Sequence, residues 1–376
     1  MNVLTLNAGS RSHSAKLYAV DERPPLDPPE PLWQAAIEAG SETFGDLLER
    51  YRGAPPAVAG HRVVHPGPAL ATRRAAVIDA SVREAIEAAV PLAPSHNPLA
   101  LEGIAASRAR YGEDVPNVAV FDTAFSDDAP DVATTYAVPP EWRARFGVRR
   151  YGFHGISQRD VIDRVERLFG ASDGRRLVSV HLGSGCSISA FLGRRIVDTT
   201  MGMTPLEGLV MGSRSGSFDP GAMFYLLREG KLSLSDLERV LGSESGLKGV
   251  SGVSSDTRDL ARAIAAGNER AGFAMDLFLY RLRWHIGALV AVLGGIDVLS
   301  FTGPVGEHVA AIRQRACEGF EYLGLTLAGD ENERAEPDCD VATRGSRVRV
   351  CVIRTLEEWA IARLAAHAIS RHGSTL

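Results

Sequence analysis

Hydrophobic and polar residues alternate over two short stretches of the chain, and a glycine turn interrupts each alternation. Residues 177–192 read LVSVHLGSGCSISAFL, with the turn at Gly183-Ser184-Gly185, a pattern typical of a β-hairpin. Residues 4–10 align with residues 178–184, and apolar residues return after that turn as well. Such a repeat predicts that the chain consists of two similar halves.

A glycine turn at the end of a strand can hold phosphate oxygens, because no Cβ keeps the backbone N–H groups from the ligand. Two such turns that face each other would bind a polyphosphate. The alternative is a pair of ordinary tight turns, since Gly and Ser are common there. The duplication leaves both interpretations open.

Apolar runs of strand length alternate with helical runs over the rest of the chain. Buried strands are predicted at residues 57–65, 118–122, 298–302 and 348–353. The third of these strands ends in another glycine turn, which opens a helix. The pattern predicts an α/β fold.

Three helices are expected to have particular ends or faces. Asn97 is predicted to be the N-cap of a helix with Pro98 at its first position, and residues 157–160 have the pattern of a capping box. Residues 269–293 carry apolar residues on all sides, which predicts a long buried helix with Trp284 and His285 in the core.

Composition and charge exclude several classes of protein. The chain has 376 residues and 45% hydrophobic content, enough for two domains, and its net charge of −5 gives no basic surplus for nucleic acid or anionic membranes. The longest apolar run, residues 286–296, is too short to span a membrane. A secretory signal pattern is missing, and the four cysteines have no CxxC spacing, so we expect free thiols in the cytoplasm.

Charged side chains follow the ends of two predicted strands, where α/β proteins place their sites. Arg62 and His65 end residues 57–65, and Asp122 ends residues 118–122. A buried Asp122 needs cations, a metal or donors nearby, although capping of the next segment is an alternative. The HRVVH stretch before Pro66 lacks the Glu and the helix of a zinc protease, so we do not expect metal there.

Other polar residues lie in glycine-rich segments or at helix starts. Glycines flank Phe153 and His154, which favours a functional over a structural histidine, and Arg214 is a second candidate anion ligand in a Gly- and Ser-rich loop. Asp256 and Arg258 have a simple alternative role as a cap and its ion pair. Glu357 has a simple alternative role as well, because an acidic residue at the start of a helix interacts favourably with the helix dipole.

Two common nucleotide-binding motifs are missing: no GxxxxGK[ST] P-loop occurs, and no GxGxxG follows a strand. Ten stretches, covering nearly the whole chain, resemble the acetate kinase family of the sugar kinase, Hsp70 and actin superfamily. They are NAGS (7–10), GHRVVHPG (60–67), APSHNP (93–98), VAVFDTAF (118–125), RRYGFHGIS (149–157), HLGSG (181–185), DTTMGMTPLEGLVMGSRSG (198–216), GVSSDTRDL (252–260), FTGPVGE (301–307) and TLEEWAIA (355–362).

The resemblance implies two duplicated ribonuclease H-like (actin-like ATPase) domains with a central cleft. The first domain would comprise residues 1–126 completed by residues 354–376. The second would comprise residues 127–353, with the nucleotide side and the interface of a homodimer. Mg²⁺ or Mn²⁺ would be the metal ion, ATP and ADP the co-substrates, and a short-chain carboxylate the other substrate.

The resemblance also implies roles for matching residues. The catalytic residues would be Asp122, Arg62, Arg214, His154 and His96. Nucleotide and phosphates would contact Asn7, Ser10, Ser12, Lys16, His181, Gly183, Ser184, Gly185, Asp256, Thr257, Arg258, Gly303, Pro304 and Gly306. The acid would lie among Arg62, Val64, Ser95, Phe153 and Pro205, and the metal would bind Asn7 and Glu357.

The implied chemistry suits these side chains. A carboxylate is ionised at pH 7, so it attacks phosphorus without a strong base. Two guanidinium groups and Mg²⁺ can screen the repulsion between an anionic nucleophile and an anionic phosphate, and such electrostatic effects dominate phosphoryl transfer. Arginine suits both oxyanions because its planar fork donates two hydrogen bonds at once.

Several positions depart from the family pattern. Where the family has Ser-Ser-Ser-x-Lys, this chain has Ser10-Arg11-Ser12-His13-Ser14, with Lys16 two places later. The other departures are Pro66 for Gly, Ser95 for Leu, Ser184 for Asn, Pro304 for Gly and His308 for Asn. Pro304 removes an N–H and adds bulk on the adenosine side.

The leading hypothesis is a reversible, Mg²⁺-dependent acetate kinase that moves the γ-phosphoryl group of ATP to acetate or propionate. Pyrophosphate as donor is an alternative, because Pro304 would obstruct adenosine. A regulatory homologue that binds nucleotide without turnover is another. The sequence leaves the acid's chain length and the direction of the reaction open.

Overall fold

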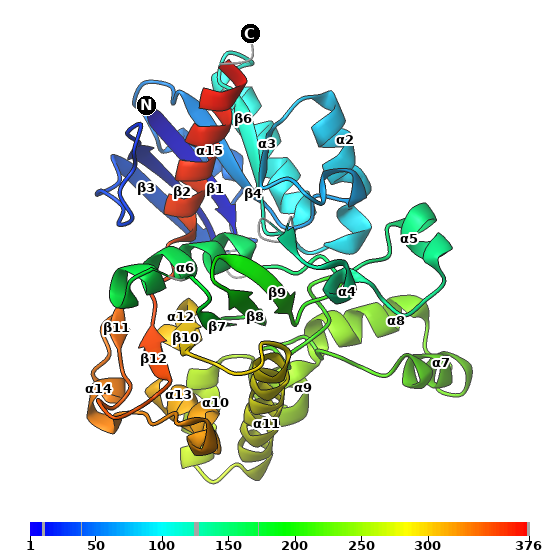
Figure 1. Cartoon of the computed structure of the whole chain (residues 1–376). Helices are drawn as coiled ribbons and strands as arrows, with labels where there is room; N and C mark the ends of the chain where they lie inside the picture. The colour runs from blue at the N-terminus through cyan, green and yellow to red at the C-terminus, as the bar shows by residue number, and fades with distance from the viewer. Residues whose placement is uncertain (10–11, 39, 124–127, 172, 374–376) are drawn as a thin grey trace.

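The computed structural model describes residues 1–376 apart from 10–11, 39, 124–127, 172 and 374–376. Two α/β halves lie one above the other in Figure 1, each with its own mixed sheet. The first sheet contains β1 (Asn2–Ala8), β2 (Ser12–Ala19), β3 (Trp33–Glu38), β4 (Val58–Val63), β5 (Ala75–Val77) and β6 (Asn117–Phe121). The second contains β7 (Arg176–Leu182), β8 (Cys186–Leu192), β9 (Arg195–Thr199), β10 (Val298–Thr302), β11 (Cys339–Asp340) and β12 (Arg349–Val352).

The two sheets have the same topology. The first has the strand order β3-β2-β1-β4-β6-β5, and the second has β9-β8-β7-β10-β12-β11 when read from the corresponding edge. In both, a three-stranded antiparallel meander is followed by two parallel strands and an antiparallel edge strand. The predicted α/β fold and the internal duplication are therefore confirmed.

Both predicted hairpins form, with their glycine turns at the same end of the repeat. Asn7 pairs with Ser14 across β1 and β2, and His181 pairs with Ser187 across β7 and β8. Residues that pair directly across two strands point to the same face of the sheet. Each hairpin therefore places a polar pair beside its turn.

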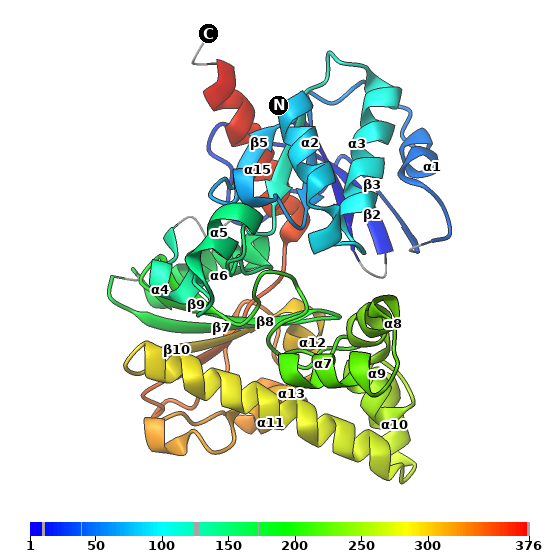
Figure 2. The same ribbon diagram turned by 90° about the vertical axis from the view of Figure 1, so that its right-hand side faces the viewer.

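Helices cover the faces of both sheets, as Figures 1 and 2 show. The first group comprises α1 (Phe44–Glu49), α2 (Ala80–Ala88), α3 (Asn97–Tyr111), α4 (Asp131–Thr134), α5 (Pro140–Phe146) and α6 (Gly155–Phe169). The remainder are α7 (Pro220–Arg228), α8 (Leu234–Arg239), α9 (Gly246–Ser251), α10 (Thr257–Ala265), α11 (Glu269–Val292), α12 (Gly303–His308), α13 (Ala310–Cys317), α14 (Gly329–Glu333) and α15 (Glu357–Gly373). None of the described helices is long and apolar enough to cross a membrane.

The last helix, α15, returns to the first sheet. Its Trp359 and Ile361 share a hydrophobic cluster with Val3, Val58 and Val118 from three strands of that sheet. Figure 1 shows α15 in red across the blue strands. The division of the chain after residues 126 and 353 stays a prediction, and these contacts agree with it.

Asn97 is not the N-cap of α3, so that prediction is wrong. His96 occupies the N-cap position, and Asn97 is the first helical residue, fully buried. Its side chain accepts from the backbone N–H of His65 and donates to the carbonyl oxygens of His65 and Ile86, at 2.9 to 3.3 Å. A buried amide is stabilised by such bonds, and here they hold α3 against the end of β4.

The predicted capping box at residues 157–160 is also wrong. Helix α6 begins at Gly155, with His154 at its N-cap in the left-handed region, at φ 60° and ψ 24°. Ser157 therefore lies inside the first turn, and its hydroxyl is 3.0 Å from Nδ1 of His181 rather than at a backbone N–H. Ser157, which the sequence pattern suggested as a helix cap, instead contacts a residue of the second sheet.

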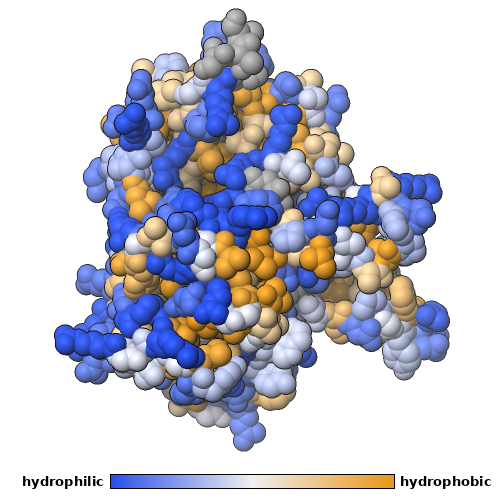
Figure 3. Space-filling model, viewed as in Figure 1, coloured by the Kyte–Doolittle hydropathy of each residue, from blue (hydrophilic) through white to orange (hydrophobic). Residues whose placement is uncertain are grey.

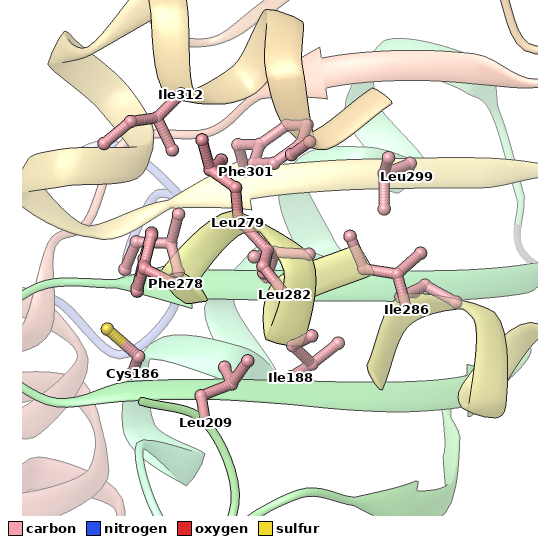
Figure 4. Packing of buried hydrophobic residues seen from close by; sticks show 14 of the residues in the cluster. Cys186, Ile188, Leu209, Phe278, Leu279, Leu282, Ile286, Leu299, Phe301 and Ile312 are labelled. Carbon is pink, nitrogen blue, oxygen red and sulfur yellow. The ribbon is translucent and has the colours of Figure 1, made fainter. Parts of the chain in front are cut away.

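Helix α11 is buried on one side only, which corrects the prediction that it is buried all round. Phe278 and Leu282 pack into the main core against β8 and β10, as Figure 4 shows. Phe273, Tyr280 and Trp284 are 62%, 59% and 54% exposed. The sequence shows that a side chain is apolar, but it does not show whether other residues of this chain bury that side chain. Trp284 is thus a surface residue, and His285 beside it is half-buried.

Ion pairs join α6 to both halves of the molecule. Arg164, which is 1% exposed, contacts Asp160 on its own helix, Asp27 from the segment between β2 and β3, and Asp338 beside β11. Arg363 from α15 also binds Asp160. Figure 3 shows a hydrophilic band across this face at the level of α6. These contacts fix α6 between the two sheets.

Candidate active site

A cleft of about 730 Å³ lies between the two halves and contains most of the predicted site residues. Both hairpin turns, the first turn of α12 and the start of α15 line it. The predicted residues among its lining are Asn7, Ser12, Arg62, His96, His154, His181, Gly183, Ser184, Gly185, Arg214, Asp256, Thr257, Arg258, Pro304 and Glu357. Residues far apart in the sequence thus meet in one place.

A second cavity of about 630 Å³ lies between α6 and α15 and contains none of these residues. Three of the arginines that line it already bind carboxylates: Arg159 binds Asp128, Arg363 binds Asp160, and Arg194 binds Asp163 and Glu166. Paired cations offer little to a ligand. The first cleft is therefore the candidate site.

Arg62 anchors the wall of the cleft formed by the first half. At the end of β4, its Nε and Nη2 donate to the two carboxylate oxygens of Asp122 at 3.2 and 2.7 Å. Its Nη1 donates to Oδ1 of Asn7 at 3.4 Å and is 3.8 Å from Oε2 of Glu357. The two carboxylates raise the pKa of Arg62 against the effect of its burial. Arg62 is thus a fixed cation. It is oriented by Asp122, the carboxylate that was expected to need a cation nearby.

Arg214 enters the cleft from the opposite half. Its Nη1 donates to the carbonyl oxygen of Pro205 at 2.7 Å, and no carboxylate of a described residue forms an ion pair with it. Burial and the proximity of Arg62 lower its pKa, although Asp122 acts in the opposite direction. Because no such carboxylate neutralises it, the guanidinium group of Arg214 can bind an anion in the cleft.

Two buried histidines lie stacked beside the second glycine turn. The rings of His154 and His181 have centroids 4.2 Å apart and planes within 21° of each other. Nδ1 of His154 is 2.9 Å from Oγ of Ser187, and Nδ1 of His181 is 3.0 Å from Oγ of Ser157. Burial, with the nearby cations, lowers the pKa of His154 well below its usual value and that of His181 to about 4. Both imidazoles are therefore neutral at pH 7.

His96 completes the group of histidines at the start of α3. It lines the same cleft, and burial together with Arg214 and Arg62 lowers its pKa to about 3. A neutral imidazole adds a hydrogen-bonding group without another charge. The three predicted site histidines are thus polar, uncharged and directed to one cleft.

Glycine leaves space beside one turn and is required by the backbone at another. A Cβ on Gly185 would lie 3.2 Å from Nη2 of Arg214 and 3.2 Å from Nε2 of His154, so the missing side chain leaves a gap between these groups. Gly303 has φ 79°, and a Cβ there would meet the carbonyl oxygen of Leu182 at 2.6 Å. The gap at Gly185 has the size and donors that an oxyanion needs.

Part of the cleft lining is apolar. Leu247, Phe278, Val305 and Val309, here called the apolar floor, line the cleft together with Asp256, Thr257 and Arg258. Asp256 caps α10 and forms an ion pair with Arg258 at 2.8 Å, so the simple local interpretation is correct and both residues also line the cleft. An apolar floor with a polar rim suits a flat base and its ribose.

Pro304 is accommodated at the first turn of α12, where a helix needs no N–H from that residue. Its ring lies beside the glycine turn, with Cδ 3.5 Å from a Cβ built on Gly183. The turn is held in place by Thr355, whose Oγ1 accepts from Gly303 N at 2.7 Å, and whose N–H donates to Glu307 at 2.9 Å. Pro304 therefore fits this turn, and it lines the same cleft as the apolar floor.

Several predicted residues are not part of the cleft lining. Lys16 points to Glu358, 3.8 Å from its carboxylate, and Ser14 donates to the same carboxylate. Val64 and Phe153 are buried in the main core, whereas Ser95 is exposed. The other predicted residues outside the lining are Asp122, Pro205, Gly303 and Gly306, and Ser10 lies outside the described residues.

Sequence reasoning did not find Ser187, Ser157 or Thr355. Ser187 could have been found, because the hairpin pairs it directly with His181 and so places it on the same face as a predicted site residue. Ser157 was assigned to a cap instead. Nothing in the local sequence connects Thr355 with a turn fifty residues earlier.

The carboxylates of the cleft suit a divalent cation that also binds phosphate. Within the described part of the chain, no three or more His, Cys, Asp or Glu side chains form a metal cluster. Glu357 is nonetheless half-buried beside Asn7, and desolvation raises the pKa of its carboxyl although Arg62 opposes this. Mg²⁺ usually takes only one or two protein carboxylates together with substrate phosphates. Asn7 and Glu357 fit that pattern.

Comparison with known proteins identifies the relatives of this chain. The model of the acetokinase family matches residues 52–363. This chain belongs to the acetokinase family. It is 44% identical to the acetate kinase of Trichormus variabilis, over 99% of this chain and 100% of that one, and 43% identical to the acetate kinase of Gloeobacter violaceus, over 96% and 98%.

Solved structures of the family have the same fold. The acetate kinase of Porphyromonas gingivalis superimposes with a TM-score of 0.84 at 34% identity, covering 98% of this chain and 99% of that one. A propionate kinase of Francisella tularensis gives a TM-score of 0.85 at 30% identity, covering 97% and 99%. The expected two-domain actin-like fold is confirmed by these neighbours.

Proposed function

We propose that this member of the acetokinase family is an acetate kinase that transfers the γ-phosphoryl group of ATP to acetate or propionate. The observation that carries the proposal is the presence of Arg62 and Arg214 on opposite walls of one cleft, with Arg214 and His154 both beside Gly185 of the second glycine turn. A turned-away or distant Arg214 would have argued against any such reaction.

The acceptor carboxylate needs positioning rather than activation. One of its oxygens attacks the γ-phosphorus, the new O–P bond forms, and the bond from phosphorus to the β,γ-bridging oxygen breaks to release ADP. Arg62 is held rigidly by Asp122 and so can bind the acceptor without a large loss of entropy. Arg214 and His154 face the space beside Gly185, where they stabilise the charge on the transferring group.

ATP is the donor that the cleft supports best. The apolar floor of Leu247, Phe278, Val305 and Val309 would be of no use to pyrophosphate, which has no base to bury. Pro304 lies in the first turn of α12 and lines the same cleft. The presence of Arg62, Arg214 and Glu357 in this cleft likewise favours turnover over a regulatory role.

Mg²⁺ or Mn²⁺ is the proposed metal ion, held by Asn7 and Glu357 together with the phosphates of the nucleotide. Bound there, it would neutralise phosphate charge. Arg62 lies within 3.8 Å of Glu357 and so adds a permanent positive charge on the same side. Hydrogen bonds hold these side chains together: Asn7 donates to Glu357 at 3.4 Å and accepts from Arg62 at 3.4 Å.

We also propose that the chain forms a homodimer through the outer face of α11. Phe273, Tyr280 and Trp284 are spaced by seven and four residues, which places them on one side of the helix, and all are more than half exposed. Figure 2 shows α11 along the outer side of the second half. Exposed apolar stripes of this kind are typical of interfaces. A cytoplasmic location stays a prediction.

The proposed activity can be tested by trapping acyl phosphate with hydroxylamine. Purified protein would be incubated with Mg²⁺, ATP and acetate, propionate or butyrate, and the same reactions would be run with pyrophosphate. We expect acyl hydroxamate with acetate or propionate and ATP. Product from pyrophosphate alone would reject ATP as donor, and no product with any pair would reject the kinase assignment.

A further inference from the structure

Ser187 and Ser157 are bonded to the stacked histidines in a way that the reaction described above does not use. Each hydroxyl contacts Nδ1 of one ring, at 2.9 Å for His154 and 3.0 Å for His181. The serines are 0% and 2% exposed, and the rings 8% and 5%. Water therefore has little access to either contact.

The ring of His154 is held in place from several directions. Its backbone is in the left-handed region, which is unfavourable for a residue with a Cβ and is found mainly where the surroundings fix it. The next N–H, that of Gly155, donates to the carbonyl oxygen of Asp122 at 2.6 Å. His181 stacks on one face of the ring. The bond to Ser187 is thus one part of a rigid arrangement.

The opposite edge of each ring faces the glycine turn of the cleft. Nε2 of His154 is 3.2 Å from a Cβ built on Gly185, and Nε2 of His181 is 3.8 Å from one built on Gly183. Among the described residues, hydrogen bonds to these two imidazoles involve Nδ1 only. Nε2 is therefore the atom that each ring presents to a bound phosphoryl group.

A neutral imidazole carries its single N–H on one of the two nitrogens, and a serine hydroxyl can either accept from Nδ1–H or donate to an unprotonated Nδ1. Neither hydroxyl has another hydrogen-bond partner among the described residues, so donation to Nδ1 is the arrangement that satisfies its buried O–H. If Nδ1 carried the proton, Nε2 would direct a lone pair at an anionic ligand. If a serine hydroxyl donates to Nδ1, Nε2 carries the N–H and becomes a donor.

We propose that Ser187 and Ser157 are positioning residues that keep His154 and His181 in the Nε2–H tautomer, so that both present a donor to the transferring phosphoryl group. The role of the donor rests on the proposed kinase function; the tautomer itself does not. Neutral donors are suitable here because Arg62 and Arg214 already supply positive charge to the cleft. A positively charged histidine would bind the phosphorylated product as firmly as the transition state, and such uniform binding does not raise kcat.

The first test reads the tautomer directly in the full-length protein. Histidine labelled with ¹⁵N is observed by multiple-bond ¹H–¹⁵N correlation, and the signals are assigned with His154→Gln and His181→Gln variants. We expect Nδ1 of both residues to have the chemical shift of an unprotonated nitrogen at pH 7. A protonated Nδ1 on His154 would overturn the proposal without any measurement of activity.

The second test uses Ser187→Ala, with Ser189→Ala as matched control. Ser189 lies two residues further on β8, is equally buried, and bonds Thr199 at 3.1 Å instead of a histidine. Loss of a partner that orients a functional histidine typically costs 10- to 100-fold. We expect kcat of Ser187→Ala to fall by about that factor, with KM for acetate changed less than about threefold. Ser189→Ala should keep kcat.

Two further readouts separate positioning from general damage. Ser187→Thr keeps the hydroxyl and should recover most of kcat, together with the Nε2–H signal. The pH profile of kcat should keep its shape in Ser187→Ala, because the imidazole stays neutral. Equal kcat in Ser187→Ala and Ser189→Ala would refute the positioning role. A wild-type protein without acyl phosphate formation would instead refute the proposed function, and the NMR result would still decide the tautomer.

Discussion

The gap at Gly185 is the feature whose removal tests the site most sharply. An alanine there places one methyl group 3.2 Å from Nη2 of Arg214, 3.2 Å from Nε2 of His154 and 3.3 Å from its Cε1. These distances are shorter than ordinary contacts, which begin at 3.4 Å, so each neighbour has to move by only a few tenths of an ångström. Gly185 does not have a positive φ, so its backbone accepts alanine.

The cost of Gly185→Ala falls on the ligand rather than on the fold. An oxygen bonded to both donors would lie about 2.9 Å from each, and the new methyl group, 3.2 Å from the same two nitrogens, would compete with it for that space. The transferring group then loses at least one charge-assisted bond in the transition state. Removing one such donor typically costs about 2.7 to 4 kcal/mol, or roughly 100- to 1,000-fold in kcat.

The assay is hydroxamate formation with saturating ATP and acetate, together with a thermal unfolding curve. We expect kcat of Gly185→Ala to fall about 100-fold or more, with a Tm within a few degrees of the wild type. Gly183→Ala is the matched variant in the same turn, since its Cβ has 3.5 Å or more to every neighbour. It should lose less than about tenfold. If Gly185→Ala kept kcat within threefold, the gap would not be an oxyanion site.

Three further predictions concern stability and assembly. Burial lowers the pKa of His61 and His181 from 6.5 to about 4, so the unfolded chain binds more protons than the folded chain below pH 6.5. The free energy of unfolding, measured with urea, should therefore fall between pH 6.5 and pH 4, by on the order of 3 kcal/mol for each histidine. An unfolding free energy that does not change over this pH range would contradict this. Asn97→Ala leaves both backbone groups of His65 without their partner and should lower the unfolding free energy by about 2 to 4 kcal/mol; a loss below about 1 kcal/mol would disprove the role of this amide. Trp284→Glu should shift the protein from dimer to monomer in analytical ultracentrifugation, and an unchanged dimer would place the interface elsewhere.

The duplicated architecture could be predicted because its signal is local. Alternation with a glycine turn specifies a hairpin, and the repeat of residues 4–10 at 178–184 specifies a second copy. The topology of both sheets then follows from the same pattern of strands. The limits of α11 could also be predicted from the sequence pattern. Its exposed face could not, because the sequence does not distinguish an apolar residue of the core from an apolar residue on the surface.

The charged part of the site could be predicted for a different reason. A buried carboxylate at Asp122 requires a partner, and Arg62 lies near the end of the neighbouring strand, β4, at the same edge of the sheet. The serines escaped prediction because a hydroxyl in a strand or helix has many possible partners. Lys16 shows the converse: a cation placed near the phosphates by resemblance has a carboxylate neighbour, Glu358, that only the fold brings close.

The cooperation of Arg62 and Arg214 across the cleft is the central claim, and a double-mutant cycle tests it most directly. Initial rates of acyl hydroxamate formation would be compared for the wild type, Arg62→Ala, Arg214→Ala and the double variant. Because both guanidinium groups act on the same pair of anions, we predict that each single variant loses at least about 100-fold and that the double variant loses much less than the product of the two losses. Acyl hydroxamate formed at the wild-type rate by either single variant would contradict the account.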